Sequence, residues 1–279
     1  MGGMKMKTLY ISALDGTLLN SRAELSNYTV ETLNRLIESG GYFSVATART
    51  AATALYILKD VKINVPIILM NGVLVYDIHA GQYIKKEVFS KQLANQISAA
   101  RKKTGQTGLM YALSGNELRT YYERLDNEPI NAFIEERRRK YNKPFERISD
   151  FDDVDGDIIY FCFLDDHKSI WRLYDEVKDI GEIRIEMYKD IYSEDLWYLE
   201  IFRETASKNN AAQFLRQKYG FEKLVCFGDN LNDLPMFAGC DECYAVANAK
   251  PELKERATAV IGSNDEDGVA RFIEENLLI

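Results

Sequence analysis

Tyr10-Ile-Ser-Ala-Leu-Asp-Gly-Thr-Leu-Leu19 is the stretch that decides the fold, because its apolar run breaks off into a turn of polar residues. Asp15 brings a carboxylate, Gly16 lets the backbone turn sharply, and Thr17 brings a hydroxyl group. Open α/β sheets bind their ligands beyond the carboxyl ends of their strands. The stretch therefore predicts a buried strand, at residues 8–12, followed by an active-site loop.

Two further apolar segments repeat this pattern. Residues 42–46 end in Thr47-Ala-Arg49, and residues 66–70 end in Asn71-Gly72. Helical spacing of apolar residues predicts a helix after the N-cap candidate Ser26 and another over residues 51–59. Alternating strands and helices with polar residues at the strand ends are typical of a doubly wound parallel sheet, the Rossmann-like α/β class.

The alternation of strands and helices is interrupted in the middle of the chain and resumes near its C-terminal end. Hairpin-like strands and amphipathic helices fill the middle of the chain, and after Thr205 a helix from Ser207 to Tyr219 precedes a buried strand at 224–227. The sequence thus predicts a core domain of residues 1–80 and 200–279 with an inserted α+β domain at 81–199.

The inserted segment is rich in tyrosine and contains one dense charged run. Eleven of the 17 tyrosines fall between Tyr76 and Tyr198. They offer aromatic surface for a ligand, although packing within the segment's own sheet explains most of them. The run Glu135-Glu-Arg-Arg-Arg-Lys140 predicts a solvated helix face rather than an anion site.

Composition narrows the class of protein. A chain of 279 residues with 46% hydrophobic and 28% charged residues predicts two globular domains. The net charge of −8 argues against a general role on nucleic acid or anionic membranes. No apolar run has transmembrane length, and residues 1–7 do not begin a signal peptide. We therefore expect a cytoplasmic protein with a small-molecule partner; the oligomeric state is not predicted.

Of the four cysteines, Cys240-Asp-Glu-Cys243 has the spacing of a metal or redox motif. The chain has only two histidines, His79 and His167, and no second cysteine pair. Reduced, structural cysteines are the expected outcome.

The second polar cluster is Gly228-Asp-Asn-Leu-Asn-Asp233, directly after a buried strand. Carboxylates packed into one turn repel each other, and a hard cation with oxygen ligands removes the repulsion. Lys208 stands in the first turn of its helix, where acidic residues are favoured. It is either a surface residue or a cation that joins the helix N-terminus in binding an anion.

Together these segments resemble the haloacid dehalogenase-like hydrolases, and within them the Cof-type phosphatases that carry a C2-type cap domain. The matching motifs span essentially the whole chain. They are Ala13-Leu-Asp-Gly-Thr17, Thr47-Ala-Arg49, Asn71-Gly72, Lys208, Gly228-Asp-Asn-Leu-Asn-Asp233, Ala247-Asn-Ala249 and Asn264-Asp-Glu-Asp-Gly-Val269. The first motif departs from the family in one position, because the family's nucleophilic aspartate is Ala13 here.

The resemblance implies a role for each matching residue and Mg²⁺ as the cofactor. Asp15 would be the general acid and base, and its backbone carbonyl would bind the metal ion. Asp229 would supply a metal carboxylate, and Asp233 would support the metal site. Thr47, Lys208 and Asn232 would hold the phosphoryl oxygens, while Asn71 and Arg49 would contact the substrate or the closed cap.

Ala13 leaves three functions open. A methyl group cannot attack phosphorus, so the chain is either a deliberately inactivated enzyme or a natural non-catalytic relative; the intact remainder of the site favours the first. The leading hypothesis is a Mg²⁺-dependent phosphatase of small phosphorylated metabolites, such as sugar phosphates, that acts through an aspartyl-phosphate. The alternatives are a phospho-ligand sensor and a phosphotransferase.

Overall fold

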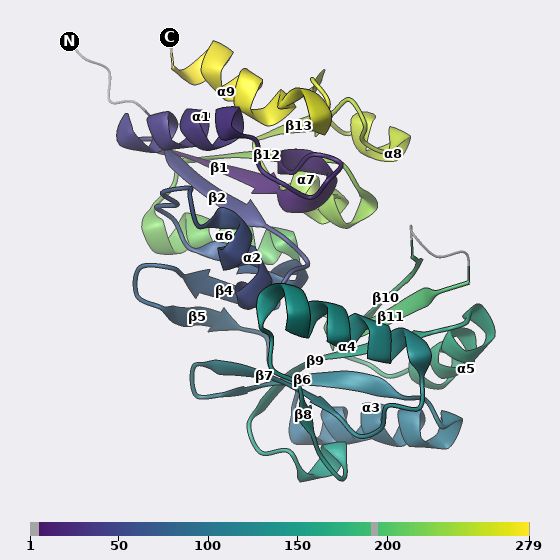
Figure 1. Cartoon of the computed structure of the whole chain (residues 1–279). Helices are drawn as coiled ribbons and strands as arrows, with labels where there is room; N and C mark the ends of the chain where they lie inside the picture. Colours follow the sequence, from purple (N-terminus) through teal and green to yellow (C-terminus); the bar gives the residue numbers. More distant parts are fainter. Residues whose placement is uncertain (1–5, 191–194, 279) are drawn as a thin grey trace. The chain divides into compact units, whose positions relative to one another are not determined.

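The computed structural model describes residues 6–190 and 195–278 and divides into two compact units (Figure 1). Unit 1 comprises residues 1–85 and 207–279, and unit 2 comprises residues 86–206. Each unit has its own sheet and hydrophobic core.

Within its described residues, unit 1 is built on one eight-stranded sheet with the order β14-β13-β12-β1-β2-β3-β4-β5. The strands from β14 to β3 are parallel, and β4 runs antiparallel to β3. This confirms the predicted α/β class with a parallel, Rossmann-like sheet. The elements are β1 (Thr8–Ala13), α1 (Asn27–Glu38), β2 (Tyr42–Ala46), α2 (Ala51–Leu58), β3 (Ile67–Leu69), β4 (Leu74–Asp77), β5 (Gln82–Lys86), α6 (Lys208–Tyr219), β12 (Lys223–Gly228), α7 (Leu234–Gly239), β13 (Glu242–Val246), α8 (Pro251–Lys254), β14 (Ala259–Ile261) and α9 (Gly268–Leu277).

The strand order reverses between β1 and β12. From β1 the chain crosses through α1 to β2, whereas from β12 it crosses through α7 to β13 in the opposite direction. Because parallel crossovers are right-handed, these two helices cover opposite faces of the sheet. The loops that leave β1 and β12 therefore flank the switch point where such sheets bind their ligands.

Local signals fix the ends of the helices that surround this point. Ser26 accepts a hydrogen bond from the backbone N–H of Thr29, and Ser207 accepts one from Asn210, so both are N-caps as predicted. α1 lies beside α9 (Figure 1), and Tyr28 and Arg35 of α1 donate hydrogen bonds to Glu274 of α9.

Within its described residues, unit 2 contains one six-stranded sheet with the order β10-β11-β9-β6-β7-β8. All pairings are antiparallel except that of β7 with β8. Its elements are α3 (Lys91–Thr104), β6 (Gly108–Ser114), β7 (Glu117–Tyr122), α4 (Glu128–Tyr141), β8 (Glu146–Arg147), β9 (Asp157–Asp165), α5 (His167–Val177), β10 (Ile183–Lys189) and β11 (Trp197–Arg203).

The two faces of this sheet differ in chemistry, because successive residues of a strand point to opposite sides. Phe161 on β9 packs against Phe89 and Phe151 on the apolar face. The other face carries hydroxyl, thiol and carboxylate groups, and α3 and α4 lie on opposite sides of the sheet (Figure 1). We call this second side the tyrosine face; the strand pairings place on it Tyr111, Tyr160, Cys162, Glu186, Tyr188, Tyr198 and Glu200.

The strands near residue 80 differ from the sequence-based expectation. The hairpin at residues 74–86 has the hairpin-like strand pattern of the inserted segment. In the structure, however, its strands β4 and β5 extend the edge of the eight-stranded sheet of unit 1. Residue 81 therefore falls inside this hairpin. No helix in the described part of the chain is long and apolar enough to cross a membrane.

Candidate active site

The Asp15-Gly16-Thr17 turn follows β1 as predicted and packs against the loop after β12. Gly16 has φ +71°, and a Cβ atom there would collide with the Asp229 carboxylate. The position therefore requires glycine for both its conformation and its close approach. Thr17 is buried, and its Oγ1 donates a hydrogen bond of 2.6 Å to Asp229 Oδ1. Ala13, at the end of β1, is only 3% exposed.

Two asparagines hold this turn from the C-terminal part of the chain. Asn248 Nδ2 donates to the Gly16 carbonyl at 2.7 Å, and its Oδ1 accepts from the backbone N–H of Asn264 at 3.0 Å. Asn264 Nδ2 donates to the Leu19 carbonyl at 2.9 Å. Sequence reasoning assigned these residues no role, although the motifs Ala247-Asn-Ala249 and Asn264–Val269 mark them. They are positioning residues for the active-site loop.

Asp233 organises the loop after β12. Its Oδ2 accepts from the backbone N–H groups of Asp229 at 3.0 Å and Asn230 at 3.1 Å. Its Oδ1 lies 2.6 Å from Lys208 Nζ, and the side chains of Lys208 and Asp233 are 4% and 1% exposed. Lys208 is thus a buried cation with a fixed partner, which excludes the surface-residue interpretation.

Asp229 is the carboxylate in this cluster that is hard to keep ionised. Burial raises its pKa to about 6, and the negative charges of Asp233 and Asp15 act in the same direction. The hydrogen bond from Thr17 and the charge of Lys208 oppose that increase. A nearby cation would favour the ionised form of such a carboxylate.

Asp15 faces Arg49 rather than the other acids. Arg49 Nη2 lies 2.6 Å from Asp15 Oδ1, and Nε lies 2.9 Å from Oδ2, so the pair is bidentate. The Asp15 side chain is 53% exposed. Arg49 is placed by its own backbone N–H, which donates to Thr47 Oγ1 at 3.1 Å.

The remaining predicted residues of unit 1, Asn71 and Asn232, lie in the loops after β3 and β12. Asn71 adopts the left-handed conformation with φ +54°, and its backbone N–H donates to the Thr47 carbonyl at 3.0 Å. Asn232 Nδ2 lies 3.5 Å from Asn71 Oδ1, the upper limit of a hydrogen bond. A Cβ atom at Gly72 would collide with the Ser207 carbonyl, so glycine lets the N-terminus of α6 approach this loop.

The oxygen donors of this site suit a hard cation, but the carboxylate expected at position 13 is absent. Asp229 offers a desolvated carboxylate and Asp15 a backbone carbonyl, both of which suit Mg²⁺. No group of three or more His, Cys, Asp or Glu side chains in the described residues is arranged to hold a metal ion. Ala13 contributes no side-chain oxygen, the Asp15 side chain pairs with Arg49, and Asp233 pairs with Lys208. All four cysteines are free thiols.

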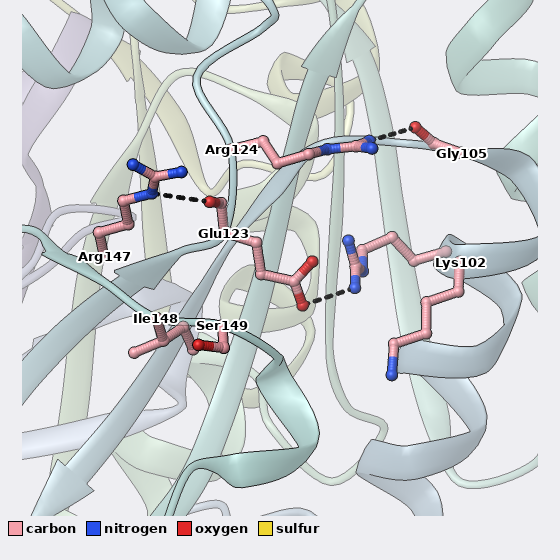
Figure 2. Close-up of a pocket in the computed structure, with 8 residues that line it drawn as sticks. Lys102, Gly105, Glu123, Arg124, Arg147, Ile148 and Ser149 are labelled. Atoms are coloured by element: carbon pink, nitrogen blue, oxygen red, sulfur yellow. Dashed lines mark hydrogen bonds and ion pairs between the residues drawn. The ribbon is translucent and has the colours of Figure 1, made fainter.

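A cavity of about 560 Å³ lies elsewhere, within unit 2 (Figure 2). Its cations are mostly neutralised by neighbouring acids. Arg101 pairs with Glu123 at 2.7 Å, Lys102 with Asp150 at 2.6 Å, and Arg124 lies 3.3 Å from Asp126. The predicted active-site residues all belong to unit 1, so we do not place the chemistry in this cavity.

Comparison with known proteins supports the family resemblance. A family model described as haloacid dehalogenase-like hydrolase matches residues 10–273. The chain is 28% identical over 297 residues to the 5-amino-6-(5-phospho-D-ribitylamino)uracil phosphatase YwtE of Bacillus subtilis, with 98% of both chains covered. It is 24% identical to the pyridoxal phosphate phosphatase YbhA of Escherichia coli, over 95% of this chain and 97% of the relative.

Solved structures show the same fold. A haloacid dehalogenase-like hydrolase from Bacteroides thetaiotaomicron has a TM-score of 0.81 at 22% identity, covering 97% of this chain and 99% of that one. A Thermotoga maritima protein has a TM-score of 0.80 at 26% identity, covering 97% of each chain. Because the family model spans nearly the whole sequence, the chain belongs to the haloacid dehalogenase-like hydrolase family.

Proposed function

We propose that the chain is the scaffold of a Mg²⁺-dependent phosphatase for small phosphorylated metabolites, inactive in the present sequence because position 13 is alanine. The buried ion pair of Lys208 with Asp233 is the observation that carries the proposal. Together with the backbone N–H groups bound by Asp233, it fixes a cation and the Asp229 loop beside the end of β1.

The substrate class follows from the relatives. Two of them are named for 5-amino-6-(5-phospho-D-ribitylamino)uracil and for pyridoxal phosphate, both small phosphate esters. We propose a small-molecule phosphate ester as the partner of this chain, and unit 2 as the cap domain that the family resemblance implies.

Each site residue has a defined task in this proposal. Thr47, Lys208 and Asn232 hold the phosphoryl oxygens, and Lys208 offsets the negative charge that spreads over them in the transition state. Asp15 donates a proton to the leaving oxygen and later removes one from water. Arg49 must release the Asp15 carboxylate before that carboxylate can carry a proton to the substrate.

The residues that would hold Mg²⁺ are Asp229, through its carboxylate, and Asp15, through its backbone carbonyl. Asp233 keeps the Asp229 loop in place through the two backbone hydrogen bonds. When bound, Mg²⁺ supplies charge neutralisation to the transferring phosphoryl group. Asn71 and Arg49 contact the substrate or the closed cap.

The test is the restoration of a carboxylate at position 13. We expect Ala13→Asp to hydrolyse at least one ester in a panel of phosphorylated metabolites with Mg²⁺, and the chain as given to hydrolyse none. Ala13→Asn, which has the same shape without a nucleophilic carboxylate, is the matched control. In the Ala13→Asp background, Asp15→Asn should abolish turnover again.

Two other results would redirect the assignment. An Ala13→Asp variant that binds phosphate esters but stays inert across the panel favours the sensor. Transfer of the phosphoryl group to a saturating acceptor alcohol, detected by product analysis, favours the phosphotransferase.

A further inference from the structure

Unit 2 contains a buried lysine that the proposed chemistry does not use. Lys143 directly follows α4 and its Asn142 C-cap, and it is 7% exposed. Its Nζ lies 4.6 Å from the ring centroid of Tyr111 and 5.0 Å from that of Phe145. Among the described residues it forms no ion pair, and its ammonium group contacts aromatic rings.

The charged groups near Lys143 increase the cost of its burial. Arg137 on α4 repels it, while the Cys162 thiol on β9 is the neighbour that favours its charge. Arg138, on the same helix, lies over the Phe145 ring at 5.8 Å. Burial and Arg137 together lower the pKa of Lys143 to about 7.

The acids of unit 2 do not compensate this charge. Arg137 pairs with Glu136 at 2.8 Å on the same helix. Glu200 on β11 acts on Cys162 and Tyr111, and no ion pair joins it to Lys143 in the part of the chain that the structure describes. Tyr111, which lies beside Lys143, is itself titratable, and burial raises its pKa, so it stays neutral. Buried cations without a partner are rare in proteins because their desolvation is uncompensated.

This arrangement differs from the cavity in Figure 2, where the buried guanidinium of Arg101 already has the carboxylate of Glu123. Lys143 is joined to Arg137 through its backbone N–H, which donates to the Arg137 carbonyl at 3.3 Å. The Arg137 guanidinium lies 3.5 Å from the Phe133 ring centroid and pairs with Glu136, whereas the Lys143 ammonium has two aromatic neighbours and no acidic partner among the described residues. The Arg137 side chain is 29% exposed, so a ligand in solvent can reach the neighbourhood of Lys143 from this side.

We propose that Lys143 and Arg137 form a binding site for an anionic group, a phosphate or a carboxylate, on a small molecule that reaches the tyrosine face of unit 2. Tyr111 and Phe145 supply apolar walls that strengthen the attraction by excluding water. The site goes beyond the proposed phosphatase activity, and it involves no residue of unit 1. The charged run 135–140 therefore combines a solvated face with one residue, Arg137, that belongs to the anion site.

The experiment is a pH titration of the full chain labelled with [¹³C]lysine and observed by NMR. The Lys143 signal is assigned by its loss in Lys143→Met. With added inorganic phosphate or succinate, we expect the midpoint of the Lys143 titration to rise by about one pH unit. Sodium chloride at matched ionic strength should not produce this rise, and the exposed Lys140 signal should not move.

Variants separate a ligand site from a structural role. Arg137→Met should reduce the anion-induced rise, whereas Lys140→Met should leave it unchanged. Lys208→Met removes the phosphate-binding lysine of unit 1 and should also leave it unchanged, so failure of the proposed function does not affect the result. A response to phosphate alone assigns a phosphoryl group, and a response to both anions includes carboxylates. A Lys143 titration that neither anion shifts beyond sodium chloride would overturn the proposal.

Discussion

The two units each contain a buried lysine, and the two lysines differ in whether an acid neutralises them. In unit 1 the Lys208 ammonium lies 2.6 Å from the Asp233 carboxylate, and Asp229 accepts a hydrogen bond from Thr17. In unit 2 the buried Lys143 lies against aromatic rings and forms no ion pair with a described residue, and the Glu200 Oε2 atom is buried without a hydrogen-bond partner there. Lys208 is thus neutralised by a neighbouring side chain of its own unit, whereas Lys143 on the tyrosine face of unit 2 is not.

The Lys208 cluster is therefore a preorganised site, whereas Lys143 belongs to a site that a ligand would complete. The unit 1 cluster keeps its geometry without a ligand, which is what electrostatic catalysis requires. The uncompensated burial of Lys143 and Glu200 lowers the folding stability of unit 2, unless a ligand offsets it. The same substitution should therefore have opposite effects in the two units.

The largest expected effect comes from replacing each buried lysine by methionine. Lys208→Met leaves Asp233 buried without its cation and should lower the free energy of unfolding by about 3–5 kcal/mol. Lys143→Met removes an unpaired buried charge and should leave the free energy of unfolding equal or higher. Urea denaturation of both variants at pH 6 measures the two effects. A loss of stability in Lys143→Met as large as that in Lys208→Met would remove the contrast between the units.

The next effect concerns Glu200 and depends on pH. Burial raises the pKa of Glu200 to about 7, and the opposing strand residue Glu186 adds to the rise, while the hydroxyl groups of Tyr160 and Tyr188 limit it. Between the unfolded value of 4.5 and about 7 the folded state binds more protons, so stability falls as pH rises through this window. The cost is fully present above pH 7.

Glu200→Gln should remove this cost. The variant should gain at most about 3 kcal/mol over the parent above pH 7, and its advantage should vanish near pH 4. Denaturation curves of parent and variant at several pH values give the difference directly. A constant difference across the range would show that Glu200 does not titrate as described.

The smallest effect is the response to Mg²⁺. The chain as given lacks one metal carboxylate, so Mg²⁺ should raise its Tm less than it raises the Tm of Ala13→Asp, because stabilisation follows affinity. Without Mg²⁺ the chain as given should be no less stable than Ala13→Asp, since it has one fewer clustered carboxylate. Thermal melts with and without Mg²⁺ test both statements. A larger Mg²⁺-induced rise for the chain as given would refute the metal assignment.

Local signals made much of the fold predictable. Ser26 and Ser207 cap their helices because short polar side chains satisfy the first N–H groups of a helix. Apolar runs that stop at polar turns predicted strands ending at residues 12 and 227, one residue before the observed ends at Ala13 and Gly228. The hairpin of β4 and β5 was harder to place, because its local pattern fits either sheet and only long-range pairing decides between them.

The side-chain contacts within the candidate site were harder to predict from the sequence than the fold. Asp15 and Arg49 are 34 positions apart, and nothing local predicts that their side chains form a bidentate pair. Asn248 and Asn264 were visible as short motifs, but their hydrogen bonds to the Asp-Gly-Thr loop depend on packing. No feature of the sequence indicated that Lys143 is buried, because an isolated lysine near a helix end is ordinarily exposed.

The central claim is that position 13 alone separates this chain from covalent phosphoryl transfer. The most direct measurement uses the Ala13→Asp variant that also carries Asp15→Asn, mixed with para-nitrophenyl phosphate and Mg²⁺. This ester has a leaving group that needs little acid assistance, while the later attack of water lacks its base. We predict a burst of one nitrophenolate per chain and an intact mass increased by one phosphoryl group at residue 13. Ala13→Asn in the same background should show neither, and an unmodified mass without a burst in the Ala13→Asp protein would contradict the claim.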